Sequence, residues 1–297
     1  MAGSRVRTFT DRSRLVIGRS RSGIGGPVSD ERRMAANERN WNARTPIHAA
    51  SAYYARDPES WFAPFEWADL GDVAGLDVVQ LQCHLGTETQ AFARRGARTS
   101  GLDLAGAAIA EARRLAAEAG VVVDYRHGNV YDAVSVLGGG RFDVVYTSKG
   151  ALCYLPDLAR WARVVADLVR PGGFAYVVDF HPVLWSLGLN PEPDEALLVR
   201  YDHLEGRGAV ERDFVRTYTD GPPLPSDRTH YEWSHGLGEL VTSLARAGLR
   251  VDLVRETDLL PWPRWSRMVR QESGWYALPP DEPRIPLVYA VKATKPE

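Results

Sequence analysis

The segment with the most specific chemistry is a strand, a tight turn and a helix start within residues 78–89. Residues 78–83 are mostly apolar and of strand length, and Gly86 precedes a helical run. Thr87 and Gln90 have the spacing of a capping box, which predicts that the helix begins there. A helix N-terminus offers unpaired N–H groups to a carboxylate or phosphate, and a glycine lets backbone approach a ligand closely. We therefore expect a ligand at this turn, although any α/β protein can contain such a turn.

A carboxylate follows the turn in the stretch Gly101-Leu102-Asp103. In folds that bind nucleotide cofactors, an acid at the end of the second strand, about 20 residues past the first turn, accepts hydrogen bonds from both ribose hydroxyls. Asp103 fits that place. The alternative is that it caps the helix that follows. We favour the ribose contact.

Strands and helices alternate around these residues. The expected strands are residues 76–83, 99–102, 121–126, 142–148 and 174–180, and the expected helices are residues 88–95, 105–119 and 157–169. This alternation predicts a parallel sheet with helices on both faces. The near-continuous apolar character of the strands indicates burial on both sides. A helix over residues 237–247 and strands over residues 249–256 and 285–293 close the chain.

Five regions follow from these patterns. Residues 1–33 are rich in Arg, Ser and Gly without any period, so we predict a disordered basic arm. It could also touch phosphate or a membrane, or precede a natural start at Met34. The other regions are an N-terminal helical cap (34–70), a core (71–182), an insertion with a small antiparallel element that forms a substrate cap (183–232), and a C-terminal helix with the closing strands (233–297).

Composition places the 297-residue chain among soluble proteins, because 44% of the residues are hydrophobic and 25% are charged. The net charge of -2 argues against a general nucleic-acid binder. Cys83 and Cys153 form no CxxC pair, so we expect no metal site and a reduced, cytoplasmic setting. The chain contains no run of 18 apolar residues, so no membrane-spanning helix is expected.

Taken together, these stretches resemble a class I, Rossmann-like methyltransferase dependent on S-adenosylmethionine. The matching stretches are VVQLQCHLGTET, TSGLDLAGAAIAEARRLA, HGNVYD, RFDVVYTSKGALCYLPDL, LVRPGGFAYVVDFHP and LVYAVKATK. The chain is similar to a bacterial small-molecule subgroup whose first motif reads LQCHxG, with a Trp-Asn-x-Arg-Thr-like stretch at residues 41–45. The resemblance implies a doubly wound, mostly parallel seven-stranded sheet with an antiparallel last strand, an N-terminal helical segment and an inserted aromatic-rich cap.

The resemblance also implies where the cofactor binds. Asp103 would hold the ribose, Leu104 would pack on the adenine, and Gln82 would bind the methionine carboxylate or ammonium. The cofactor-binding prediction comprises Gln82, His84, Gly86, Thr87, Asp103, Leu104, Asn129, Val130 and Ser148. The usual acid of the first strand is Gln80 here, and Gln82 and His84 replace two usual glycines. A cation beside a sulfonium is unfavourable, so Lys149 is expected to face solvent or to pair with an acid.

The implied reaction is methyl transfer to a small molecule, with nitrogen or oxygen favoured over carbon as the acceptor atom. A histidine suits a general base, and His181 and His235 are the catalytic candidates because they border the carboxyl edge and the insertion. His48 lies in the N-terminal segment as a further candidate. Tryptophan faces bind flat rings, so an acceptor that is planar or aromatic is expected at Trp41, Tyr53, Trp233 and Trp262.

Two other classes of protein remain open. A nicotinamide-dependent oxidoreductase would carry GxGxxG after the first strand, where this chain reads QCHLGT. A non-catalytic protein that binds S-adenosylmethionine or a nucleotide could keep the same site without transferring a group. The sequence predicts neither the substrate's identity nor the oligomeric state.

Overall fold

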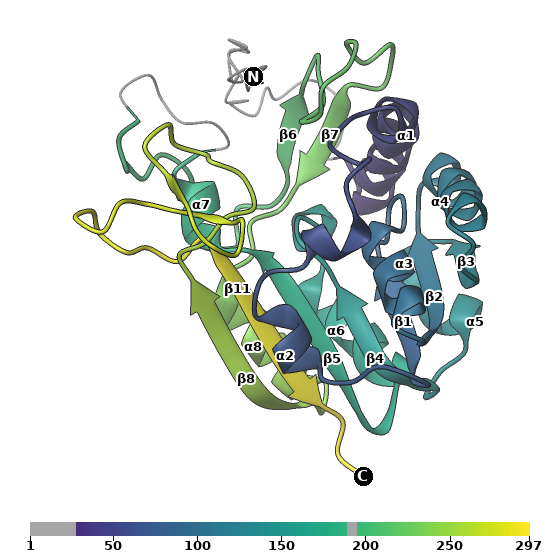
Figure 1. Cartoon of the computed structure of the whole chain (residues 1–297). Coiled ribbons are helices and arrows are strands. Elements are labelled where there is room, and N and C mark those ends of the chain that lie inside the picture. Colours follow the sequence, from purple (N-terminus) through teal and green to yellow (C-terminus); the bar gives the residue numbers. More distant parts are fainter. Residues whose placement is uncertain (1–27, 189–194) are drawn as a thin grey trace, which may run out of the picture.

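A seven-stranded sheet forms the centre of the computed structural model, which describes residues 28–188 and 195–297 (Figure 1). Its strands are β1 (Asp77–Leu81), β2 (Arg98–Asp103), β3 (Val123–His127), β4 (Phe142–Thr147), β5 (Val169–Phe180), β8 (Arg250–Thr257) and β11 (Val288–Thr294). The strand order is β3-β2-β1-β4-β5-β11-β8. The first five strands are parallel, and β11 is antiparallel to both of its neighbours. The predicted fold class is therefore confirmed.

Both faces of the sheet are buried along its central strands, as their apolar sequences predict, whereas the edge strands β3 and β8 keep exposed residues. Neighbouring residues Val78 and Val79 of β1 belong to separate hydrophobic clusters, because alternate side chains of a strand point to opposite faces. One cluster includes α5 (Ala133–Leu137), α6 (Leu158–Leu168) and α8 (Leu237–Arg246). The other includes α2 (Glu66–Leu70), α3 (Thr87–Arg94) and the loop between β8 and β11, which holds the short strands β9 (Val269–Arg270) and β10 (Tyr276–Ala277). A third cluster joins α4 (Gly106–Glu118) to β3.

The N-terminal helix α1 (Asp30–Ala49) is longer than expected. Residues 30–33 belong to it rather than to a disordered arm, while residues 1–27 lie outside the described part of the chain. The buried side of α1 is largely polar, so the helix has no apolar stripe of the kind that predicts a helix from sequence. Between α1 and β1 the chain forms only α2 and a 3-10 turn, η1 (Pro58–Trp61).

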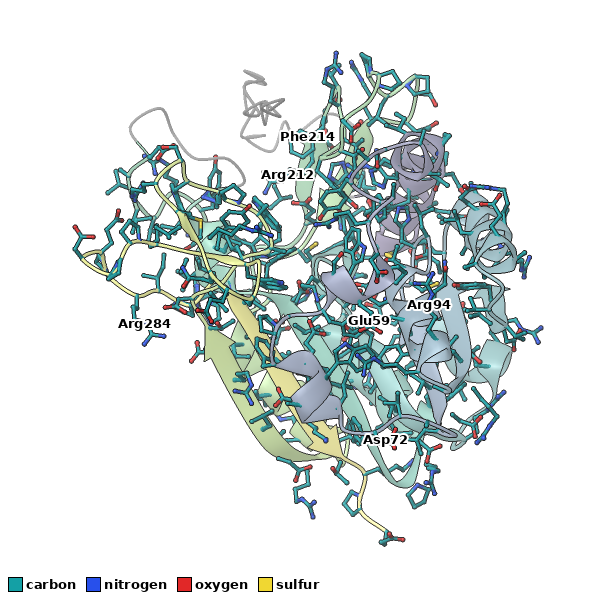
Figure 2. The ribbon with its side chains drawn as sticks, viewed as in Figure 1. Glu59, Asp72, Arg94, Arg212, Phe214 and Arg284 are labelled. Atoms are coloured by element: carbon teal, nitrogen blue, oxygen red, sulfur yellow. The ribbon has the colours of Figure 1, made fainter. Side chains whose placement is uncertain are left out.

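The insertion contains the antiparallel element that was expected. It is the hairpin of β6 (Val210–Asp213) and β7 (Thr229–Glu232), preceded by the short helix α7 (Pro182–Ser186). The hairpin and α1 lie together above the upper edge of the sheet (Figure 1). Arg212 and Phe214 mark this region in Figure 2, and Arg284 marks the loop before β11 on the other side of the molecule.

The capping-box prediction is wrong. The N-cap of α3 is Gly86, with φ 71° and no side-chain hydrogen bond, and the hydroxyl of Thr87 donates to Glu88 instead. A Cβ on Gly86 would lie 2.1 Å from the hydroxyl of Tyr125. The turn therefore needs glycine for two separate reasons, its left-handed backbone and the close approach of Tyr125.

Candidate functional site

The turn after β1 is held in an unusual backbone conformation. Gln82 and His84 have φ values of 56° and 48°, a region that residues other than glycine rarely occupy. Gln80, at the place of the usual acid, accepts a hydrogen bond of 2.5 Å from Thr89 and donates one of 3.1 Å to Ser148. These contacts tie the turn to both α3 and the end of β4. Strain of this kind persists only where the surroundings fix it, and it is common at ligand sites.

Asp103 lies beside the turn, at the end of β2. Its carboxylate accepts one backbone hydrogen bond from His84 and one from Ala105, both of 2.8 Å. Burial raises its pKa. Each carboxylate oxygen keeps a further lone pair, so the group can still accept hydrogen bonds from a diol. The N-cap of α4 is Ala105, so Asp103 does not occupy the cap position itself.

A small pocket of about 340 Å³ opens at the ends of β1, β2 and β3. Its lining residues are Met34, Asn37, Trp41, Gln82, Leu102, Asp103, Leu104, Gly128, Asn129, Val130, Tyr154 and Leu155. Five of the nine predicted cofactor residues are among them. The other four, His84, Gly86, Thr87 and Ser148, lie in the turn or at the end of β4 and do not line the pocket.

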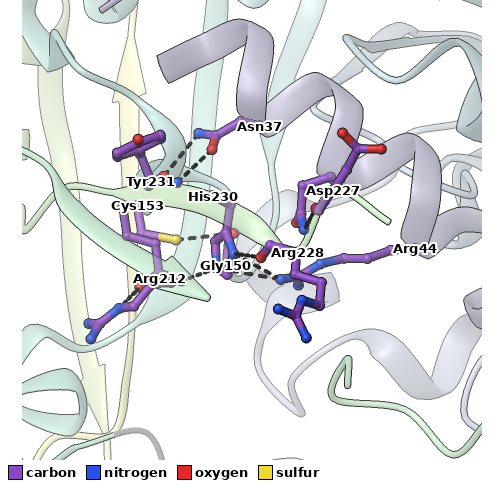
Figure 3. Close-up of polar contacts among 11 residues, drawn as sticks. Asn37, Arg44, Gly150, Cys153, Arg212, Asp227, Arg228, His230 and Tyr231 are labelled. Atoms are coloured by element: carbon purple, nitrogen blue, oxygen red, sulfur yellow. Dashed lines mark hydrogen bonds and ion pairs between the residues drawn. The ribbon is translucent and has the colours of Figure 1, made fainter. Parts of the chain in front are cut away.

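Two buried side chains, one in this pocket and one beside it, each carry a polar atom without a hydrogen-bond partner in the described part of the chain. Gln82 donates through Nε2 to the carbonyl of Ala151 (2.9 Å), but its Oε1 accepts nothing. Arg44 of α1 is 3% exposed, its Nε is unpaired, and no carboxylate of the described residues pairs with it. Its nearest polar contact is the imidazole of His230, at 3.3 Å (Figure 3). The guanidinium of Arg44 lies over the ring of Trp41, which lines the pocket together with Gln82, although Arg44 itself is not a lining residue.

The hairpin and α1 are joined by polar contacts. Asn37 donates to the carbonyl of Tyr231 and accepts from its backbone N–H, at 2.9 and 2.7 Å (Figure 3). Asn40 donates to the carbonyl of Asp227. These bonds hold the hairpin against the helix that covers the small pocket. The sequence does not predict a role for Asn37 and Asn40, because neither residue belongs to a recognisable motif.

A large pocket of about 740 Å³, open at its mouth, lies beyond the ends of β4 and β5. Its lining residues are Leu152, Cys153, Asp179, Phe180, Pro182, Trp185, Tyr201, Asp202, His203, Val210, Arg212, Glu232, Trp233, Ser234, His235 and Tyr289. The 3-10 turn η3 (Leu152–Tyr154) separates the two pockets, because Leu152 and Cys153 line the large one while Tyr154 lines the small one.

The predicted acceptor-binding residues do not lie together. Trp233 lines the large pocket, whereas Trp41 lines the small one. Tyr53 packs edge-on against Trp61 near the end of α1. Trp262 packs edge-on against Phe180, outside both pockets.

The two predicted catalytic histidines are near the large pocket, and three of their four ring nitrogens have a hydrogen-bond partner, while Nε2 of His181 has none among the described residues. His235 lines it, with Nδ1 2.8 Å from Glu239 and Nε2 2.8 Å from the carbonyl of Leu155. His181 is the N-cap of α7 and accepts through Nδ1 from the N–H of Val183. Its Nε2 lies 2.9 Å from Glu256. Burial lowers the pKa of His181.

A cluster of aromatic and imidazole rings joins α1 to the first turn. The ring of His48 stacks on Tyr54 and is tilted against Tyr218, and the ring of His84 is edge-on to Trp41. The sequence predicts His48 only as a further candidate base. Its partners lie 36 and 169 residues away, at His84 and Thr217, so no local motif could have connected them.

Comparison with known proteins identifies the family. Residues 78–173 match the family model described as a methyltransferase domain. The chain is 31% identical over 185 residues to the ubiquinone biosynthesis O-methyltransferase of Methylobacterium sp. (strain 4-46), which covers 55% of this chain and 69% of that protein. The chain belongs to the class I methyltransferases that use S-adenosylmethionine.

Other similar proteins agree with this assignment. The enzyme of the same name from Ralstonia nicotianae is 35% identical over 134 residues, which cover 42% of this methyltransferase and 56% of that protein. This chain thus spans little more than half the length of several curated relatives. The fold also matches solved methyltransferase structures from Mesorhizobium loti (TM-score 0.54, 24% identity, 76% of this chain and 94% of that one) and Clostridium acetobutylicum (TM-score 0.56, 14% identity, 86% and 99%).

The residues around the small pocket fit the cofactor chemically. The methionine end of S-adenosylmethionine carries an ammonium and a carboxylate, which match the free Oε1 of Gln82 and the uncompensated guanidinium of Arg44. The acid that ends β2 matches a ribose diol. Asn129 offers an amide at the edge of the same pocket.

In the described ranges 28–188 and 195–297, no helix is both long and apolar enough to cross a bilayer. The same residues contain no cluster of three or more His, Cys, Asp or Glu side chains that could hold a metal ion.

Proposed function

We propose that this methyltransferase transfers a methyl group from S-adenosylmethionine to an oxygen or nitrogen of a small, planar acceptor. The observation that carries the proposal is the shared wall between the two pockets. Residues of η3 line both, so a cofactor in the small pocket and an acceptor in the large pocket would meet at η3. An in-line transfer needs the methyl carbon and the acceptor atom in direct contact, so the two ligands would react where the pockets adjoin, past the edge of η3.

On this proposal the small pocket holds the cofactor. Asp103 would accept the ribose hydroxyls, Leu104 and Val130 would enclose the adenine, and Asn129 would meet its edge. Arg44 would bind the carboxylate and Gln82 the ammonium. The bound cofactor supplies an electrophilic methyl on a sulfonium with a good leaving group.

The protein's own contribution is alignment and exclusion of water. Holding the two reactants in line can lower the barrier by up to roughly 7–11 kcal/mol. Here α1 and the β6–β7 hairpin are held together over the small pocket by the two asparagines, and the backbone N–H of Trp233 donates to the carbonyl of Cys153 in η3 (2.8 Å). These contacts fix the wall at which the reaction would occur.

The acceptor class is supported by the walls of the large pocket. Five aromatic side chains contribute to it: Phe180, Trp185, Tyr201, Trp233 and Tyr289. The curated relatives are named as O-methyltransferases of ubiquinone biosynthesis. Together these observations favour a ring that carries a hydroxyl, with an amine as the second choice.

The proposal is tested by incubating the purified protein with labelled S-adenosylmethionine and a panel of catechols, phenols, anilines and aliphatic amines. We expect label to enter a ring hydroxyl. The Trp233→Ala variant should raise the KM for the acceptor without changing affinity for S-adenosylhomocysteine. Transfer to none of the panel by protein that binds S-adenosylhomocysteine would contradict this acceptor class.

A further inference from the structure

Asp179 is a buried carboxylate in the wall of the large pocket. It is the second-last residue of β5 and is 4% exposed. Its side chain lies on the same face of the strand as Ala175 and Val177, which belong to the hydrophobic cluster that includes α6 and α8. A charged group at the end of an apolar stripe is costly to bury, so its presence calls for an explanation.

The carboxylate is fixed by backbone hydrogen bonds. Its Oδ1 accepts from the N–H groups of Gly150 (2.5 Å) and Phe180 (2.7 Å). Its Oδ2 accepts only a long bond of 3.3 Å from the N–H of Leu152 in η3. Both lone pairs of Oδ1 are therefore used, whereas Oδ2 keeps one that can accept a hydrogen bond from a molecule in the pocket.

The chain segment that binds Asp179 also borders the small pocket. Gln82, which lines the small pocket, donates to the carbonyl of Ala151 at 2.9 Å. The N–H groups of the residues before and after Ala151 donate to Asp179 instead. Residues 150–152 thus connect a side chain of the small pocket to a carboxylate of the large one. A hydroxyl bound at Asp179 would lie next to the place where the two pockets adjoin.

We propose that Asp179 is the general base, and that its Oδ2 takes the acceptor's proton during methyl transfer. The inference rests on the proposed function, since it needs an acceptor that loses a proton. As the acceptor oxygen takes the methyl group, the carbon–sulfur bond breaks and leaves its electron pair on sulfur. The O–H bond of the acceptor also breaks, and its proton moves to Oδ2. Water at the open mouth of the pocket then removes the proton and restores the carboxylate.

The surroundings of Asp179 suit a base. Burial raises its pKa to about 6, against the opposing effect of its backbone hydrogen bonds and of Lys149. A base is most effective when its pKa lies near the working pH. The other titratable groups that face the carboxylate are Cys153 of η3 and Tyr289, its neighbour across the β5–β11 pair. Burial raises the pKa of both groups, so both are neutral at pH 7.

Most other titratable side chains of the large pocket are engaged elsewhere. Glu232 accepts a 3.0 Å hydrogen bond from Arg212, and Asp202 lies 3.0 Å from Arg207. Both ring nitrogens of His235 face acceptors, a carboxylate and a carbonyl, so both donate and neither is free to take a proton.

Two histidines are the rival bases. His203 lines the large pocket from the insertion, and its ring lies 6.3 Å from that of His181. His181 has a ring nitrogen without a hydrogen-bond partner among the described residues, but it is not a lining residue of the pocket. Asp179 differs from both because it lines the pocket and is bonded to the segment between the two pockets.

The kinetic test uses catechol as the probe acceptor. Asp179→Asn, checked for folding by circular dichroism, should lower kcat at neutral pH by roughly 10²–10⁴-fold, the range for loss of general base catalysis. In the wild type, kcat/KM for catechol should fall as the pH drops below about 6. The variant should lack this step, and its residual rate should rise about tenfold per pH unit because only ionised catechol then reacts. Affinity for S-adenosylhomocysteine should stay within about twofold.

A more acidic acceptor separates a base from a supporting residue. The probe 4-nitrocatechol is largely ionised just above neutral pH and needs no base, so Asp179→Asn should slow its methylation far less than that of catechol. Equal losses for the two acceptors would overturn the proposal, because they would mean that Asp179 only supports η3.

The rivals and a control are tested in the same assay. Asp124 is an exposed carboxylate of β3, so Asp124→Asn should change neither the rate nor the pH profile. His203→Asn and His181→Asn should keep the fall below about pH 6. A fall that persists in Asp179→Asn and disappears in either histidine variant would overturn the proposal.

A further measurement needs no variant. The carboxyl ¹³C resonance of Asp179, assigned through its neighbours in the chain, should titrate near pH 6 and should shift when catechol binds to the wild type with S-adenosylhomocysteine present. Catechol that binds without moving this resonance would overturn the proposal, because a base must contact the acceptor. Wild type that neither binds nor methylates catechol would contradict the proposed function and the inference with it. Methylation that Asp179→Asn leaves intact would contradict the role of Asp179 alone.

Discussion

The ammonium of Lys149 donates a 2.9 Å hydrogen bond to the carboxylate of Glu66, and both side chains are buried, at 6% and 0% exposure. Lys149 directly follows Ser148 beyond the end of β4, where a free cation would oppose a sulfonium. Glu66 of α2 removes that charge and also accepts from Tyr146. The expected pairing of Lys149 with an acid is therefore confirmed.

Removing one partner of this pair should be strongly destabilising. Lys149→Ala leaves the carboxylate of Glu66 buried without a cation, which should lower the free energy of unfolding by about 3–5 kcal/mol. Chemical denaturation followed by circular dichroism measures this. The double variant Lys149→Met/Glu66→Gln should lose less than the sum of the two single losses.

The control for this prediction is an exposed ion pair. Arg126 and Asp124 are 53% and 46% exposed and 2.8 Å apart, so Arg126→Ala should cost under about 1 kcal/mol. Equal losses at the two sites would show that burial of the Lys149–Glu66 pair contributes nothing.

Gly86 and Gly120 form a matched pair for testing the first turn. Both are left-handed, with φ of 71° and 67°, but a Cβ meets Tyr125 only at Gly86, while nothing lies within 4 Å at Gly120. Gly120→Ala should cost about 1–2 kcal/mol for the backbone conformation alone. Gly86→Ala should cost clearly more and weaken cofactor binding. Thermal melts and titration with S-adenosylhomocysteine check both effects, and equal losses would contradict the close packing.

Asp179 should make stability depend on pH. Burial raises its pKa from 3.8 to about 6, although it accepts backbone hydrogen bonds from Gly150, Leu152 and Phe180. Because the folded state holds the proton more tightly, the contribution is fully present below pH 3.8 and is lost as pH rises through 6. The two-unit difference corresponds to about 3 kcal/mol.

Asp179→Asn isolates this effect, since the amide does not titrate. Relative to this variant, the wild type should lose about 3 kcal/mol of unfolding free energy between pH 3 and 7, with about 2 kcal/mol of that loss between pH 4 and 6. Urea denaturation at several pH values measures the difference, and Asp124→Asn controls for the loss of one exposed carboxylate. A difference independent of pH would contradict the assignment.

The core could be predicted from sequence because its signals are local. The apolar strand of residues 78–81, the acid at Asp103 and the alternating helices each depend on neighbours in the chain, and the strand order follows from the resemblance. The small pocket was also largely predicted, since its residues follow the ends of β1, β2 and β3 directly.

The parts that were missed depend on distant partners. The buried side of α1 is polar, so its helical period carries no hydrophobic signal. Arg44 stands out only in the structure, where its Nε is buried without a partner among the described residues. The sequence predicts His84 only as a cofactor-binding residue of the turn, because its link to His48 and Thr217 brings together three separate segments of the chain. The capping box failed because the left-handed Gly86 occupies the N-cap.

The most direct test of the account is calorimetric titration of the purified protein with S-adenosylhomocysteine and with 5′-methylthioadenosine, which lacks the carboxylate and ammonium. The wild type should bind S-adenosylhomocysteine at micromolar concentration. Asp103→Ala, checked for folding by circular dichroism, should lose both ligands, while Arg44→Gln should weaken only S-adenosylhomocysteine, by roughly 10–100-fold for a lost charged hydrogen bond. No binding by well-folded wild type would contradict the cofactor site, and equal losses of both ligands in Arg44→Gln would contradict the role of Arg44.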